Sequence, residues 1–135
     1  QHPMTSIASD GPMTVFGVGS PHPRTYGTFA RVLGSYVRER NILSLEEAVR
    51  KMTSLPAQIL SIKQRGLIKE GYYADIAIFD PKTIIDKATF EDPHQYAIGV
   101  ISVIVNGIIV IDQGVHNGNK PGRVLRGPGY NGSNN

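Results

Sequence analysis

The chain has 135 residues, of which 40% are apolar, so it has the length of one ordinary domain and can bury a modest core. Its net charge of +3 comes from 14 basic residues scattered among 11 acidic ones, a pattern that argues against a nucleic-acid partner. The absence of cysteine excludes disulfides, thiolate metal sites and a cysteine nucleophile. No apolar run approaches the roughly 20 residues that cross a bilayer, and no signal peptide precedes the first apolar residues. We therefore expect a cytoplasmic protein without a membrane partner, and the start at Gln1 suggests a piece of a longer chain.

The first predicted element is a short strand over residues 4–9 that ends at Asp10. Gly11 and Pro12 then stop regular structure and open a loop over residues 11–27. A carboxylate at the carboxyl end of a strand lies where catalytic groups of α/β enzymes gather. The alternative is that Asp10 and Gly11 form only a turn.

A helix is predicted over residues 28–40, with Thr28 as its cap. Its apolar residues recur at spacings of three and four, which places them on one face: Phe29, Val32, Leu33, Tyr36 and Val37.

Two shorter helices are predicted next. Ser44 and Glu47 have the spacing of a capping box, which starts the second helix. Pro56 suits the first position of a third helix that runs to about Ile62.

After residue 63 the pattern is typical of strands. An apolar run over residues 74–79 predicts one strand, and two β-branched runs joined by Asn106 and Gly107 predict a type I′ hairpin. Residues 128–135 are polar and rich in glycine, so we expect a disordered tail.

Arg24 stands in the loop that follows Asp10. Pro23 fixes the backbone between His22 and Arg24, and this stiffness suits an arginine that must present a planar fork to a carboxylate. A rigid Arg24 near Asp10 would suit an acidic group of a substrate. A solvated arginine in a surface loop is the alternative.

The other polar residues suggest less. None of the histidines forms an HxH or HxxxH pair, so this chain does not compose a metal site by itself, and we expect turn or surface positions for His2, His22, His94 and His116. Asp75 and Asp80 bracket a strand and are expected to be turn and edge residues.

A set of motifs from His2 to Gly127 resembles the C-terminal third of the D-aminoacylases, which are N-acyl-D-amino-acid deacylases of the amidohydrolase superfamily. The pattern HPRxxGTFxRVL is the most particular to that family. The motifs that carry the resemblance are IASDG, PHPRTYGTFARVLGSYVRE, LEEAVRKMTSLPAQ, RGLIKEGYYADIAIFDP, VNGIIV and PGRVLRG.

The resemblance implies an α/β fold built from part of a metal-dependent (β/α)8 barrel and part of a small β domain. Residues 1–62 would be the end of the barrel, with residues 4–10 as strand 8 and residues 28–40 as the following helix. Residues 63–127 would be the C-terminal strands of the β domain, before the tail.

The resemblance also implies roles for three residues. Asp10 matches the aspartate that lies beside the zinc, as a neighbour or weak ligand, and acts as general base and acid in amide hydrolysis. Arg24 matches the arginine that holds the α-carboxylate of an N-acyl-D-amino acid, and His22 supports it. The other zinc ligands of the family have no counterpart here, so we expect this chain to be inactive alone.

Two alternatives remain open at this point. The chain is the C-terminal segment of a zinc-dependent deacylase that pairs with a missing N-terminal barrel portion. Otherwise it is a truncated gene product or a non-catalytic, β-rich module that associates with itself through exposed edges and apolar faces.

Overall fold

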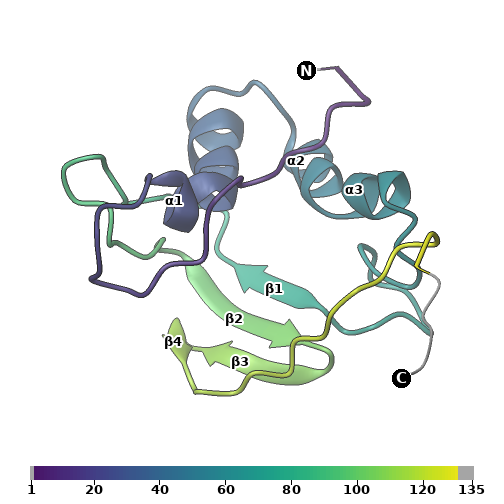
Figure 1. The fold of residues 1–135 in the computed structure, drawn as a ribbon. Helices are drawn as coiled ribbons and strands as arrows, with labels where there is room; N and C mark the ends of the chain where they lie inside the picture. The colour runs from purple at the N-terminus through teal and green to yellow at the C-terminus, as the bar shows by residue number, and fades with distance from the viewer. Residues whose placement is uncertain (1, 131–135) are drawn as a thin grey trace.

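The computed structural model describes residues 2–130, which form a helical layer followed by an antiparallel sheet (Figure 1). Strand β1 is the strand nearest to the helices in this view. Most of the tail predicted over residues 128–135 lies outside the described residues. None of the described helices is long and apolar enough to cross a membrane.

Helix α1 spans Arg24–Arg31 and begins four residues earlier than predicted. Pro23 occupies its N-cap position, and its fixed φ of −50° already belongs to the helical region. Thr28 does not cap the helix, because its hydroxyl donates to the carbonyl of Arg24, 3.0 Å away and one turn earlier. The predicted start at Thr28 is therefore wrong, and the loop before α1 is shorter than expected.

The chain continues directly into η1, a π-helix over Val32–Glu39. Its wider turn is visible where the Arg40 N–H donates to the carbonyl of Ser35, five residues back, at 2.9 Å. Gly34 lies against the segment after β1: a β-carbon on it would come within 2.5 Å of the Ile84 carbonyl oxygen. The helical layer thus packs closely on this segment.

Helix α2 spans Leu45–Met52 and has the predicted cap, since Ser44 Oγ accepts from the Glu47 N–H at 3.2 Å. The Glu47 carboxylate pairs with Arg50, at 2.7 Å, instead of reaching back to the cap. Helix α3 spans Ser54–Ile59, so the predicted bounds from Pro56 to Ile62 are wrong. Pro56 lies at the third helical position, within the first turn, where its missing N–H breaks no helical hydrogen bond.

The sheet has the order β1-β2-β3-β4, with all neighbours antiparallel. The predicted hairpin is confirmed, because Asn106 and Gly107 join two strands and both have positive φ, 49° and 81°. The strand predicted over residues 74–79 is present but shorter. The four strands are β1 (Ile76–Phe79), β2 (Val100–Val105), β3 (Ile108–Asp112) and β4 (Val115–His116).

The strand predicted over residues 4–9 is wrong, since this segment has no regular structure and belongs to no sheet. A strand needs a paired neighbour to satisfy its backbone groups, and the four described strands pair only with one another. The segment lies along α2 instead, where the Ile7 N–H donates to the carbonyl of Lys51 at 3.0 Å.

The core lies where the helices meet the segment after β1. Its buried apolar side chains are Ala30, Val32, Leu33, Ala48 and Ile84.

Candidate functional site

Asp10 and Arg24 form an ion pair, with 2.9 Å between Asp10 Oδ2 and a terminal guanidinium nitrogen. Asp10 ends this N-terminal segment with a φ of 49°, a left-handed conformation that aspartate tolerates better than most residues. Its side chain is 83% exposed and that of Arg24 is 43% exposed, so both groups face solvent. The structure therefore brings together the two residues that the sequence predicted as a site.

His22 and Pro23 position Arg24 at the first residue of α1. The Arg24 N–H donates to His22 Nδ1 at 3.1 Å, and the Thr25 N–H donates to the His22 carbonyl at 3.0 Å. The imidazole also meets the ring of Phe90 edge to face, with 4.8 Å between centroids. His22 thus shapes the turn that presents the guanidinium, without contacting Asp10.

A cavity of about 360 Å³ opens beside this turn. It lies between the beginning of α1 and the connection after β1, and most of its polar lining is charged. Its lining includes His22, Arg24, Arg31, Asp86, Phe90 and Glu91.

Arg31 and Asp86 hold α1 against the connection that forms the other wall. Their ion pair measures 2.7 Å, and the Asp86 side chain is only 8% exposed. A β-carbon on Gly27 would lie 2.7 Å from Cβ of Asp86, so glycine is needed for this close approach. Sequence reasoning missed this pair, because its partners are 55 positions apart.

Lys51 anchors the segment that leads to Asp10. Its side chain is 3% exposed, and Nζ donates to the carbonyls of His2, at 2.5 Å, and Thr5, at 2.9 Å. Glu47 Oε1 lies 3.5 Å from the same ammonium. The i,i+4 spacing of Glu47 and Lys51 is the one sequence signal that could have pointed to this anchor.

The described residues contain no group of three or more histidine, cysteine, aspartate or glutamate side chains that could hold a metal ion. Asp10 alone offers one carboxylate, whereas a zinc centre needs at least three protein ligands. Residues 2–130 therefore do not fit a zinc site by themselves.

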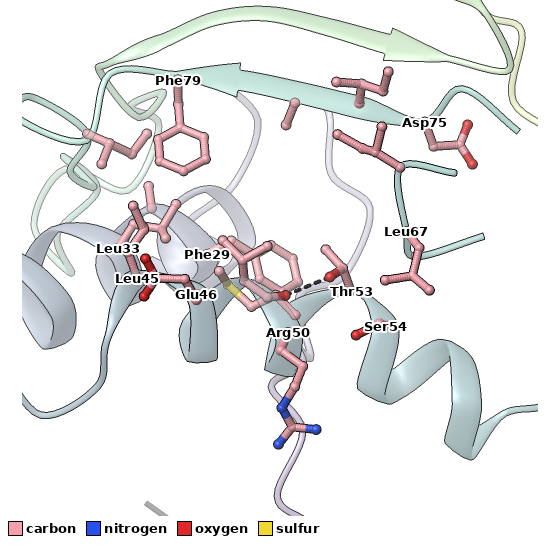
Figure 2. Close-up of a pocket in the computed structure, with 18 of the residues that line it drawn as sticks. Phe29, Leu33, Leu45, Glu46, Arg50, Thr53, Ser54, Leu67, Asp75 and Phe79 are labelled. Atoms are coloured by element: carbon pink, nitrogen blue, oxygen red, sulfur yellow. Dashed lines mark hydrogen bonds between the residues drawn. The ribbon is translucent and has the colours of Figure 1, made fainter. Parts of the chain in front are cut away.

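A larger cavity, of about 900 Å³, lies between the helices and β1, away from Asp10 and Arg24. Figure 2 shows Phe29 and Phe79 pointing into it from the two sides. The hydroxyl of Thr53 donates to the carbonyl of Val49 at 2.7 Å. Its walls are mainly apolar. We do not regard it as a reaction site, because it lacks convergent polar groups.

A sequence profile described as "Amidohydrolase family" matches residues 2–111. The chain belongs to the amidohydrolase family. This result confirms the amidohydrolase part of the resemblance inferred from the motifs.

Curated relatives of this amidohydrolase chain come from Alcaligenes xylosoxydans xylosoxydans. An N-acyl-D-glutamate deacylase is 43% identical over 126 residues, which cover 93% of this chain and 25% of the relative. A D-aminoacylase is 49% identical over 105 residues, which cover 78% of this chain and 22% of the relative. The amidohydrolase chain thus spans about a quarter of the length of these relatives.

Solved structures show the same relationship. A crystal structure of a D-aminoacylase aligns with a TM-score of 0.83 and 48% identity, covering 90% of this chain and 25% of that one. The N-acyl-D-glutamate deacylase of Bordetella bronchiseptica, solved with zinc and a phosphonate inhibitor, aligns with a TM-score of 0.81 and 43% identity, covering 93% and 26%. The helices and the small antiparallel sheet are therefore an arrangement found in amidohydrolases.

Proposed function

We propose that this chain is the C-terminal segment of a zinc-dependent amidohydrolase that converts N-acyl-D-amino acids to a carboxylic acid and a D-amino acid. The observation that carries the proposal is the ion pair between Asp10 and Arg24. The relatives, an N-acyl-D-glutamate deacylase and a D-aminoacylase, support the substrate class. A non-catalytic association module would not need a carboxylate and a guanidinium held together in an open site.

In this proposal, residues 1–62 belong to the end of a (β/α)8 barrel and residues 63–127 to a small β domain. The fit of the described residues to D-aminoacylase structures, at 48% identity, supports this division.

Asp10 acts as the general base and then as the general acid. Its carboxylate accepts a proton from the water whose oxygen bonds to the amide carbon. When the carbon–nitrogen bond breaks, the same proton passes to the leaving nitrogen, and Asp10 returns to its charged form. The exposure of Asp10 leaves room for both water and amide.

Arg24 binds the α-carboxylate of the substrate. A guanidinium can hold a carboxylate through two parallel hydrogen bonds, and this geometry orients the amide beside the base. The substrate carboxylate takes the place that Asp10 occupies on Arg24 in the free protein, so that binding releases Asp10 for proton transfer. His22 supports this step by fixing the turn before α1.

Zinc in the proposed enzyme requires ligands from outside residues 2–130, because the donor set within them is insufficient.

The test uses a chimera in which residues 2–130 replace the matching segment of the Alcaligenes D-aminoacylase. We expect it to hydrolyse N-acetyl-D-amino acids faster than their L enantiomers, and to act poorly on an analogue that lacks the α-carboxylate. The unmodified D-aminoacylase is the positive control. An inactive chimera, or one that cleaves the decarboxylated analogue equally well, would contradict the proposal.

A further inference from the structure

His94 contacts three residues that are distant from it in sequence. Its Nδ1 lies 3.1 Å from the backbone nitrogen of Gly17 and 3.0 Å from the hydroxyl of Tyr26. Its Nε2 lies 2.9 Å from the carbonyl oxygen of Gly19. The loop that follows Asp10 and the connection between β1 and β2 therefore meet at the His94 side chain.

The backbone partners determine the tautomer of His94. The Gly17 N–H can only donate, so Nδ1 must be unprotonated and accept. The Gly19 carbonyl can only accept, so Nε2 must carry the proton and donate. A neutral imidazole with its proton on Nε2 satisfies both backbone partners, and the Tyr26 hydroxyl then shares the single lone pair of Nδ1 with the Gly17 N–H.

Aromatic packing strengthens the same junction. The ring of Phe16 stacks on Tyr96, with 4.8 Å between centroids and 21° between planes. The same ring meets the edges or faces of Tyr26, at 6.0 Å, and His94, at 5.6 Å. Such contacts contribute beyond the burial of area alone. The middle of the loop is therefore attached both to α1 and to the connection.

We propose that His94 is a positioning residue for the Asp10–Arg24 site. Asp10 begins the loop that contains Gly17, and Arg24 lies two residues before Tyr26 in the sequence and in the same helix. By binding the loop and the helix at once, His94 limits the arrangements in which Asp10 and Arg24 can meet. The functional part of this inference rests on the proposed deacylase activity.

The first measurement concerns the junction itself and needs no activity. Amide hydrogen exchange of Gly17 is compared between the full chain and its His94→Ala variant, and we expect exchange about tenfold faster in the variant. His94→Asn keeps an acceptor near the position of Nδ1 and should restore part of the protection. His116→Ala is the matched control, because His116 Nδ1 also accepts a backbone N–H, from Gly118 at 3.0 Å, but on β4.

The second measurement uses the same substitutions in the chimera. We expect His94→Ala to lower kcat/KM by about 10²-fold, as misplacement of reacting groups does, while His94→Asn recovers part of the loss and His116→Ala changes little. An unchanged exchange rate of the Gly17 amide in His94→Ala would show that His94 does not hold the loop. Altered exchange with unchanged kcat/KM would overturn the positioning role. An inactive chimera with wild-type His94 would contradict the proposed function. The exchange measurement would then still test whether His94 holds the loop.

Discussion

A β-carbon built on Gly11 would lie 2.8 Å from Cα of Thr25, so the backbone directly after Asp10 touches the beginning of helix α1. Real β-carbons do not approach another atom so closely. This contact brings the two ends of a loop of 13 residues together. It explains how the Asp10 carboxylate oxygen can lie 2.9 Å from the Arg24 guanidinium nitrogen.

The first prediction concerns this contact. Gly11→Ala should push the segment away from α1 and lower kcat/KM of the chimera by about 10²-fold, the effect expected for a displacement near 1 Å. Gly122→Ala is the control, because a β-carbon there meets no atom within 4 Å. Equal kinetics for the two variants would show that the close approach does not matter for the site.

Arg24→Lys should weaken substrate capture. Lysine keeps the positive charge but replaces a planar fork by a point charge, so bidentate binding of a carboxylate is lost. We expect KM of the chimera for N-acetyl-D-amino acids to rise about tenfold, with a smaller change in kcat. Arg123→Lys, at an exposed position after the sheet, serves as control. An unaltered KM in Arg24→Lys would argue against carboxylate binding.

Gly107→Ala should destabilise the sheet. Gly107 has a φ of 81°, a conformation that costs a residue with a β-carbon about 1 kcal/mol or more. The variant should therefore unfold at a lower urea concentration than the wild-type chain. Gly129→Ala is the control, because a β-carbon at Gly129 meets no atom within 4 Å, and it should leave the urea midpoint unchanged. Coincident midpoints for all three proteins would count against the role of the turn.

Glu47 should contribute to the loss of stability in acid. The Arg50 guanidinium beside it lowers the pKa of Glu47 from 4.5 to about 2, with a smaller contribution from Lys51. Because the folded state favours the carboxylate, this contribution is complete above the ordinary pKa and is lost as the pH falls toward about 2. As the pH falls from 4.5 to about 2, the urea midpoint of Glu47→Gln should therefore decline less than that of the wild type or of Glu46→Gln. Parallel declines would refute this assignment.

Local chemistry allowed part of the fold to be predicted. The hairpin depends on two adjacent residues that accept positive φ, and the start of α2 depends on a serine three residues before Glu47. Each of these two structures is determined by residues that are close together in the sequence, so it can be predicted from the sequence alone. The start of α1 was missed because Thr28 offered a good cap, whereas Pro23 already had helical geometry.

Long-range contacts could not be predicted in the same way. The segment over residues 4–9 has the residues of a strand, but its state depends on whether a neighbour is available for pairing. His94 was expected at a turn or on the surface, yet its ring binds Gly17 and Gly19 more than 70 positions away. For the site, the sequence suggested that Asp10 and Arg24 serve one substrate, and the resemblance to D-aminoacylases suggested their roles, but their direct ion pair was not predicted.

The most direct test is kcat of the Asp10→Asn chimera with an N-acetyl-D-amino acid. Asparagine is nearly the same size but cannot accept and return the proton, so we predict that kcat falls by about 10²- to 10⁴-fold. Asp112→Asn, on β3, should retain wild-type kcat. If Asp10→Asn also retains it, Asp10 is not the proton acceptor and the account is wrong.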